Sequence, residues 1–317
     1  MSIDIICMGE PLAEFNATRG DGGYQFGFGG DTSNAAVAAA RQGASVAYVS
    51  AIGDDEPGHA FVALWAREGV DATHVRVDPQ APTGVYFVTH GKEGHVFSYL
   101  RAGSAASRLT PQDVPLDVIR RAKALHVSGI SQAISTSACD AVFAAMETAR
   151  NAGVLVSYDS NLRLKLWPLT RARAVIHAAM ACCDIARPGL DDARQLTGLA
   201  EPDAIVDFYL RLGAKIVALT LGREGAIVAT QLERRLVPSI SVNPVDATGA
   251  GDCFDGAFLA EYLNCGDPFK AGRYAAVAAA LSTRGFGAVA PVPNRQEVEA
   301  ALALETPSLP LSAGEVA

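Results

Sequence analysis

The sequence predicts an α/β fold with a doubly wound, mostly parallel sheet that is covered by helices. Three observations point to it. From Thr110 onward, short apolar runs alternate with longer segments of helical periodicity, as is typical of parallel sheets. Half of the 317 residues are hydrophobic, which is enough for a large core. Two separated segments, 10–32 and 83–108, carry apolar residues with a period of two and predict a small additional sheet.

The predicted strands of the first third of the chain differ in pattern. Residues 3–9 form an apolar run that ends at glycine and predicts a buried strand, followed by a polar connection. Aromatic residues alternate over 24–28, which predicts a short strand with one exposed face. Residues 84–90 and 95–101 alternate as well, and Gly-Lys-Glu-Gly at 91–94 predicts a hairpin turn between them.

The remaining elements are predicted from apolar runs and from helical patterns, some of which stop at glycine, as at Gly43 and Gly69. The predicted strands span residues 45–51, 124–128, 155–159, 185–187, 216–221 and 226–230. The predicted helices span residues 34–42, 59–68, 137–152, 170–182, 190–197, 201–212, 249–263 and 269–281.

These elements divide the chain into two predicted parts. The core comprises residues 1–9, 33–82 and 109–317, and a β lid comprises residues 10–32 and 83–108. The chain therefore enters the lid twice. In parallel sheets of this kind, ligands bind beyond the carboxyl ends of the strands, so we expect the functional residues there.

The composition excludes several classes of partner. The 26 basic and 34 acidic residues give a net charge of −8, whereas nucleic-acid binding needs a basic surface. The same charge disfavours anionic membranes, and the longest apolar stretch, 275–281, is too short to span a bilayer. The N-terminus lacks the features of a signal peptide, and the six cysteines form no CxxC pair. We expect a reduced, cytoplasmic protein with no nucleic-acid or membrane partner.

The segment 246–252, Asp-Ala-Thr-Gly-Ala-Gly-Asp, precedes an amphipathic helix. The small residues at 249–251 allow backbone amides to point at a bound oxyanion, and the helix N-terminus adds about half a positive charge. An aspartate beside these amides cannot be the anion ligand, because like charges repel. Asp252 is therefore predicted to act as a base on a hydroxyl during phosphate transfer. The alternative is an acid that only stabilises the helix start.

A second loop enters a helix at 29–34, Gly-Gly-Asp-Thr-Ser-Asn. The glycines, Gly30 among them, permit close backbone approach, and the amide of Asn34 can bind a sugar diol. The alternative is that Asp31, Thr32 or Ser33 simply caps the helix. The occurrence of this loop far upstream of 246–252 makes the pair of motifs much more specific than either one.

Together, the two motifs resemble the signatures of the ribokinase-like (pfkB) carbohydrate kinases. The matching segments are GGDTSNAAVAAARQG at 29–43 and DATGAGDCFDGAFL at 246–259, and the resemblance spans nearly the whole chain. It implies a ribokinase-like, Rossmann-type three-layer α/β core with a β-sheet lid, and transfer of the ATP γ-phosphate to a sugar hydroxyl. By this resemblance Asp252 is the base, and the amides of Gly249, Ala250 and Gly251 form the anion hole.

The resemblance also implies where ATP binds. The expected contacts are Thr220, Gly222 and Gly225 of the segment LTLGREGA, together with Gly249 and Gly251. No GxxxxGK[ST] motif is present, which excludes a P-loop ATPase.

Mg²⁺ is the second implied cofactor. The family usually carries Asn-x-x-Glu for a water-mediated magnesium contact, whereas this chain has Gly-Leu-Asp-Asp at 189–192, which leaves Asp192 as the remaining carboxylate. A monovalent cation such as K⁺ is implied near Asp246 and Thr248.

Two arginines point to an acidic substrate. Arg101 ends the second lid strand, and Arg163 follows a core strand, so both are expected at the cleft. Two guanidinium groups suit a carboxylate, which a neutral sugar lacks. The alternative is that both are surface or ion-pairing residues. The surrounding stretches resemble the branch of the family that phosphorylates 2-keto-3-deoxygluconate, and this resemblance assigns Tyr86, Tyr99, Arg101 and Arg163 to the substrate, with Gly30 and Asn34 at its hydroxyls.

The implied reaction converts ATP and 2-dehydro-3-deoxy-D-gluconate to ADP and the 6-phosphate, as in Entner–Doudoroff-type sugar-acid breakdown. The alternatives are a fructokinase- or ribokinase-type kinase for a neutral sugar and, from another class, a non-catalytic sugar sensor. The apolar residues of the lid, such as Phe26, Phe28 and Phe87, leave an edge that needs cover. They predict a homo-oligomer that pairs through the lid.

Overall fold

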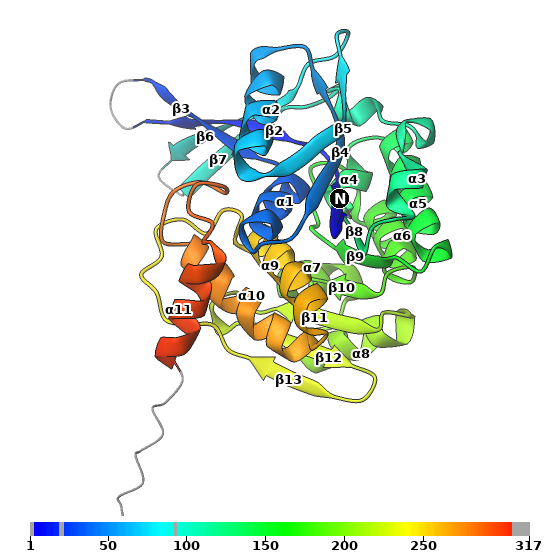
Figure 1. Cartoon of the computed structure of the whole chain (residues 1–317), viewed down its shortest axis with the longest axis vertical. Helices are drawn as coiled ribbons and strands as arrows, with labels where there is room; N and C mark the ends of the chain where they lie inside the picture. The colour runs from blue at the N-terminus through cyan, green and yellow to red at the C-terminus, as the bar shows by residue number, and fades with distance from the viewer. Residues whose placement is uncertain (1–2, 19–21, 92–93, 306–317) are drawn as a thin grey trace, which may run out of the picture.

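The structure is a computed structural model that describes residues 3–18, 22–91 and 94–305. The described strands form two sheets (Figure 1), and the larger one has the order β13-β12-β11-β10-β9-β8-β1-β4-β5. Every neighbouring pair from β11 to β5 is parallel, and β12 and β13 join antiparallel at one edge. The prediction of a mostly parallel sheet is confirmed. Its strands are β1 (Ile5–Met8), β4 (Val46–Gly53), β5 (Val70–Asp78), β8 (Ala124–Ser128), β9 (Leu155–Asp159), β10 (Ile185–Arg187), β11 (Ile216–Thr220), β12 (Ala226–Thr230) and β13 (Arg234–Val237).

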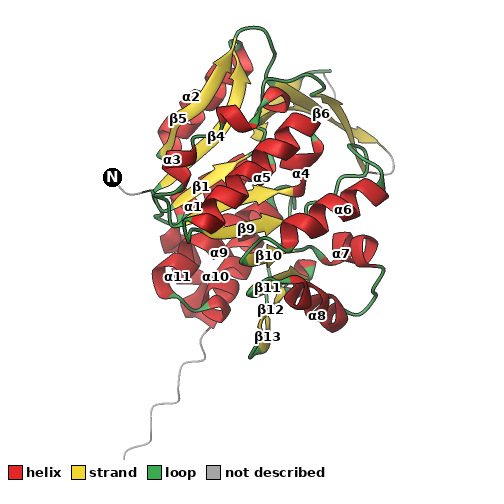
Figure 2. Cartoon of the chain, turned by 90° about the vertical axis from the view of Figure 1, so that its right-hand side faces the viewer, coloured by secondary structure: helices red, strands yellow, loops and turns green. Residues whose placement is uncertain are grey.

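Helices cover both faces of this sheet, because successive side chains of a strand point to opposite faces. In β1, Ile6 and Met8 pack into one core, and Ile5 and Cys7 pack into the other. The first core is covered by α3 (Leu116–Ile119), α4 (Gly129–Ala133), α5 (Thr136–Asn151), α6 (Leu169–Met180), α7 (Leu190–Thr197) and α8 (Pro202–Leu212). The second is covered by α1 (Asp31–Arg41), α2 (Glu56–Glu68), α9 (Ala250–Cys265), α10 (Pro268–Ser282) and α11 (Arg295–Glu305). Figure 2 shows α5 and α6 in front of the strands.

The second sheet has the order β3-β2-β6-β7, at the upper left of Figure 1. Its strands are β2 (Leu12–Ala17), β3 (Tyr24–Gly29), β6 (Gly84–Gly91) and β7 (Gly94–Leu100). Parallel pairing of β2 with β6 joins the two separated segments of the chain. We call this sheet the lid. In the predicted turn between β6 and β7, Lys92 and Glu93 lie outside the described residues, and the boundary between core and lid stays a prediction.

Several sequence predictions differ from the structure. The polar connection expected after residue 9 is wrong, because Leu12–Ala17 forms β2. The strand was not predicted because Glu14 interrupts its apolar pattern, although this polar side chain is buried on the inner face of the lid. Strands β5 and β13 and helix α11 were not predicted. Helix α1 starts three residues earlier than expected, at Asp31, and its N-cap is Gly30 without a side-chain cap.

Helices α1 and α9 approach each other very closely. A Cβ atom added to Gly256 of α9 would lie 2.3 Å from the carbonyl oxygen of Ala35 and 2.6 Å from the amide nitrogen of Ala39. Glycine therefore permits the contact. The approach brings the first turns of both helices, which carry the two predicted motifs, to the same end of the sheet. Among the described residues, no helix is both long enough and apolar enough to traverse a membrane.

Candidate active site

A cavity of about 1080 Å³ lies between the lid and the carboxyl ends of β9 and β10. This is where ligands bind in doubly wound sheets. Most of the predicted site residues line it: Gly30, Asn34, Tyr86, Tyr99, Arg101, Arg163, Asp192, Thr220, Thr248, Gly249, Gly251 and Asp252. The residues that do not line it are Gly222, Gly225, Asp246 and Ala250.

Asp252 lies in the first turn of α9, where the two predicted motifs meet. The turn follows Gly249, whose φ of 76° is left-handed and whose added Cβ would lie 2.7 Å from Ala288 Cβ, so glycine is required there. From α1, Asn34 Nδ2 donates a hydrogen bond of 2.8 Å to Asp252 Oδ2. Asn34 Oδ1 is buried without a hydrogen-bond partner among the described residues, which leaves an acceptor for a ligand hydroxyl.

The environment of Asp252 suits a base. Burial, and then the negative charge of Asp31, raises the pKa of Asp252 to about 7, while the hydrogen bond from Asn34 opposes the shift. A carboxylate with this pKa is largely ionised just above neutral pH and accepts a proton more readily than an ordinary aspartate does.

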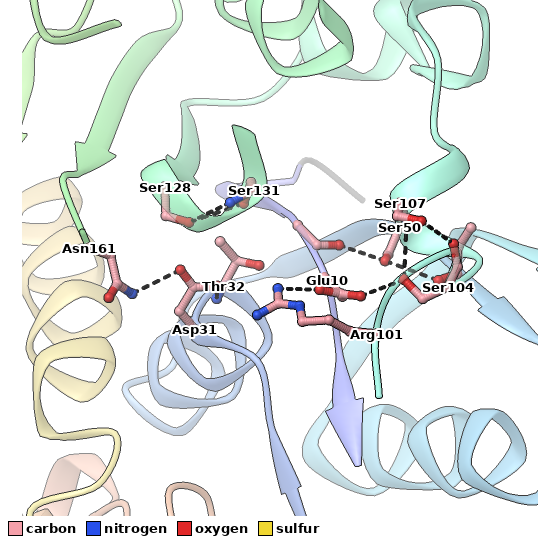
Figure 3. Close-up of polar contacts among 12 residues, drawn as sticks. Glu10, Asp31, Thr32, Ser50, Arg101, Ser104, Ser107, Ser128, Ser131 and Asn161 are labelled. Carbon is pink, nitrogen blue, oxygen red and sulfur yellow. Dashed lines mark hydrogen bonds and ion pairs between the residues drawn. The ribbon is translucent and has the colours of Figure 1, made fainter. Parts of the chain in front are cut away.

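Asp31 is a cavity residue to which the sequence assigned only a capping alternative. Its Oδ1 accepts the amide of Thr32 at 2.9 Å, and its Oδ2 accepts Asn161 Nδ2 at 2.9 Å (Figure 3). Asn161 has a φ of 27°, an uncommon value for a residue other than glycine. The hydrogen bond between Asn161 and Asp31 holds the loop after β9, which carries Arg163, against the start of α1.

Arg101 is not a free guanidinium. Its Nη2 is paired with Glu10, a buried residue that also accepts a 2.5 Å hydrogen bond from Ser104 Oγ (Figure 3). A buried carboxylate needs such partners, so the ion-pairing alternative holds for Arg101. An acidic residue two positions after the buried strand β1 is the sequence signal that was missed. Arg101 lines the cavity, and its Nε is buried without a hydrogen-bond partner among the residues that the structure describes.

The other predicted substrate residues differ in whether protein groups already occupy their polar atoms. Tyr86 donates a hydrogen bond from its hydroxyl to Glu14, and its ring stacks on Tyr99 with centroids 5.7 Å apart. Burial, and then the charge of Glu14, raises the pKa of Tyr86. Arg163 is exposed and donates to the carbonyl of Leu162 at 2.9 Å, and none of the described carboxylates pairs with it. Arg163 is thus the predicted cation that stays available.

On the predicted nucleotide side, Thr220 ends β11 and lines the cavity. Gly222 and Gly225 lie in the turn before β12, and an added Cβ at Gly225 would meet the carbonyl oxygen of Val237 at 2.1 Å. Gly225 therefore lets this turn pack on β13. The amide of Ala250 donates to the carbonyl of Ala247 at 3.2 Å, so of the three predicted anion-hole residues only Gly249 and Gly251 lie at the cavity wall.

The predicted metal contacts already have protein partners. Asp192 Oδ2 accepts the amide of Leu162 at 2.8 Å, and burial raises the pKa of this carboxyl. Asp246 Oδ1 accepts the amide and the hydroxyl of Thr248 at 2.9 and 2.7 Å, and Oδ2 accepts the amide of Gly287 at 3.0 Å. Asp192 lines the cavity and suits a water-mediated contact. The Asp246 loop is held by its own hydrogen bonds, so the monovalent cation stays a prediction.

Comparison with known proteins places the chain in a family. The model of the pfkB family carbohydrate kinases matches residues 1–295. The chain belongs to this family. It is 36% identical over 309 residues to the 2-dehydro-3-deoxygluconokinase of Thermoproteus tenax, with 93% of each chain covered. It is also 39% identical over 234 residues to the probable fructokinase-5 of Arabidopsis thaliana, covering 73% of this chain and 72% of that one.

A solved structure confirms the fold of this pfkB family member. A putative ribokinase II from E. coli, in complex with ATP and Mg²⁺, matches with a TM-score of 0.89 at 26% identity, and the match covers 96% of this chain and all of that one. The predicted ribokinase-like fold is therefore confirmed, and the chain is a sugar kinase. Its relatives include kinases named for an acidic sugar and kinases named for a neutral one.

Proposed function

We propose that this sugar kinase transfers the γ-phosphate of ATP to O6 of 2-dehydro-3-deoxy-D-gluconate. The observation that carries the proposal is Arg163, an exposed guanidinium at the wall of the cavity that holds Asp252. A guanidinium binds a carboxylate bidentately and more strongly than it binds a neutral hydroxyl. Lys165, on the same loop, lines the cavity as well. The likeness to the Thermoproteus tenax kinase supports the acidic substrate.

In this proposal the protein positions the reacting groups and removes a proton. Asp252 accepts the proton of O6, and Asn34 holds Asp252 through Nδ2 while its Oδ1 accepts a second sugar hydroxyl. The amides of Gly249 and Gly251, at the N-terminus of α9, face the negative charge on the transferred phosphoryl group. Asp192, at the cavity wall, would hold Mg²⁺ through water, and the ion would offset the negative charge of the ATP phosphates.

Replacing Arg163 by alanine is expected to raise the KM for the keto acid by about 10- to 100-fold with little change in kcat, since a hydrogen bond to a charged group contributes about 1.5–3 kcal/mol. A coupled ADP-release assay with sugar acids and neutral sugars measures this. The matched control is Arg171→Ala, because Arg171 is exposed on α6 and donates a hydrogen bond of 3.3 Å to Thr136 Oγ1, away from the cavity. An unchanged KM in the Arg163 variant contradicts the acidic substrate.

A neutral sugar is the second candidate, and the Glu10–Arg101 pair favours it. Because Glu10 already balances the charge of Arg101, the pocket holds one fewer free cation than two unpaired arginines would supply. The likeness to a probable fructokinase points the same way. Faster turnover of fructose or ribose than of the keto acid in the same assay would establish this candidate.

The proposed enzyme pairs through the outer face of the lid. Phe15 and Phe87 stack there with ring centroids 5.3 Å apart, and Phe26 and Tyr24 contact them at 5.5 Å each. Phe26 and Tyr24 are 40% and 48% exposed. An aromatic cluster this open to water is typical of an interaction surface.

Phe26→Lys is expected to convert a dimer to a monomer, because a lysine at the centre of the aromatic cluster would be buried without a partner. Sedimentation velocity at several protein concentrations measures the change. Val62→Lys, at a similarly exposed position on α2, is the control and is expected to leave the dimer intact. A wild-type chain that sediments as a monomer at every concentration would refute pairing through the lid.

A further inference from the structure

A buried ion pair lies beneath the first turn of α9. Arg187, the last residue of β10, pairs through Nε with Asp255 Oδ1, and the two side chains are 3% and 1% exposed. Such a pair is weak evidence for a stabilising role, because the desolvation of both charges offsets their attraction. Arg187 lies outside both signature segments, whereas Asp255 lies within the second one, and Arg187 lines the cavity.

Arg187 contacts α9 on both sides of Asp252 in the sequence. Its Nη2 donates to the carbonyl of Gly251 at 3.1 Å, before Asp252. After Asp252, the guanidinium carbon lies 4.4 Å from the centre of the Phe254 ring, and Nε pairs with Asp255. A single planar group thus ties the turn that carries the base to the end of a central strand.

The guanidinium also lies within a cluster of negative charge. Carboxylate oxygens of Asp159, Asp252 and Asp255 lie within 4.8 Å of one another. Burial, and then the charge of Asp255, raises the pKa of Asp159, and Arg187 opposes that shift. Burial alone would lower the pKa of Arg187, but these three carboxylates raise it. The arginine therefore stays charged at the point where the acidic groups converge.

We propose that Arg187, held by Asp255, is a positioning residue that fixes the first turn of α9 and supplies the buried positive charge that keeps the Asp252 carboxylate ready to accept a proton. This inference rests on the proposed role of Asp252 as the base, and it does not depend on which sugar is the acceptor.

Charged groups face Asp252 from every element packed against it. They are Asp31 on α1, Asp159 on β9, Arg163 on the loop after β9, Arg187 on β10 and Asp255 on α9. His126 Nε2 on β8 lies 3.9 Å from Asp255 Oδ2, and burial lowers the pKa of His126, which favours its neutral form. When the Arg187 charge is lost, Arg163 is the one remaining positive charge among these five groups. The pKa of Asp252 therefore rises. Loss of the Asp255 charge has the opposite effect.

The test separates the effect of the Arg187 charge from the effect of its contacts with α9. It measures kcat and kcat/KM against pH, with the sugar that the enzyme phosphorylates fastest. Arg187→Gln removes the charge and is expected to move the acidic limb of kcat/KM upward by about one pH unit, since a neighbouring opposite charge shifts a pKa by about 1–3 units. Asp255→Asn keeps an acceptor for Nε and is expected to move the limb downward.

Arg187→Lys keeps the charge but loses the planar fork, so the limb stays in place while kcat at high pH falls by about 10- to 100-fold, as expected for a small displacement of a catalytic group. The control is Arg295→Gln. Arg295 pairs with Glu261 near the other end of α9 at 3.0 Å, so this variant lowers Tm without moving the acidic limb.

Removing a buried charge can unfold a protein, so a double variant is included. Arg187→Met/Asp255→Leu removes both members of the ion pair together, so neither is left buried without the other, and circular dichroism and Tm establish that it folds. It is expected to keep the acidic limb near its original pH, because two opposite effects cancel, and to lose kcat about tenfold or more because the anchor of the turn is gone. A folded double variant with full kcat, or an Arg187→Gln variant with an unmoved limb, overturns the proposal. Full activity of the Asp252→Asn variant would instead overturn the proposed role of Asp252 as the catalytic base, on which this inference rests.

Discussion

Asp252→Asn is expected to lower kcat by about 10³–10⁴-fold while sugar and ATP binding change little, because general-base catalysis contributes up to about that factor. The substitution preserves shape, and the hydrogen bond from Asn34 Nδ2 to residue 252 can persist. The fold should therefore be intact. Steady-state ADP release gives kcat, and isothermal titration gives the two binding constants.

The pH profile supplies a second readout for the same residue. The proposed base, Asp252, would accept a proton in its ionised form, and burial raises its pKa to about 7. The kcat/KM of the native chain should therefore rise with pH through about 7 and level off above it. The residual activity of the asparagine variant should lack this rise. Asp203→Asn, on the exposed face of α8, is the matched control and should keep both kcat and the profile.

A non-catalytic sugar sensor gives the opposite result. Such a protein would bind the sugar equally well with either residue at position 252 and would release no ADP above background. Native activity that falls by less than tenfold in the asparagine variant would show that another group removes the proton. The outcome thus separates an enzyme from a sensor and also tests the base directly.

The sequence predicted the parts of the site that depend on local motifs. Gly30 is the N-cap of α1 and Asn34 lies in its first turn, and Gly249 and Asp252 have the matching places in α9, so each motif marks a helix start through its own residues. The strand–helix alternation predicted the order of the core elements for the same reason. A pattern repeated along the chain is sufficient to place such residues at one end of a sheet.

Side-chain pairing between distant segments was not predictable in this way. Glu10 and Arg101 are 91 residues apart, and Asp31 and Asn161 are 130 apart. No local pattern shows that one residue neutralises the other. Arg101 was accordingly expected to be a free cation, whereas it neutralises the charge of the buried Glu10. Strand β2 was missed for a related reason, since Glu14 is buried only because Tyr86 satisfies it from another strand.

Gly256→Ala is expected to destabilise the protein by about 2–3 kcal/mol, in spite of the roughly 1 kcal/mol by which alanine favours a helix over glycine. The added Cβ would lie 2.3 Å from the Ala35 carbonyl oxygen and 2.6 Å from the Ala39 amide nitrogen. Both atoms are backbone, so the clash cannot be relieved by a rotamer change. Helices α1 and α9 must move apart instead.

The same movement should weaken catalysis before the protein unfolds, because the two helices carry the two partners of the Asn34–Asp252 hydrogen bond. Thermal unfolding should show a Tm lower by several degrees. The kcat of the variant should already be reduced at temperatures well below those at which it unfolds. Asn264→Ala, at an exposed position on α9, provides the control and should change the free energy of unfolding by less than about 0.5 kcal/mol. A Gly256→Ala variant as stable and active as the native chain would mean that the close approach of these helices does not hold the base in place.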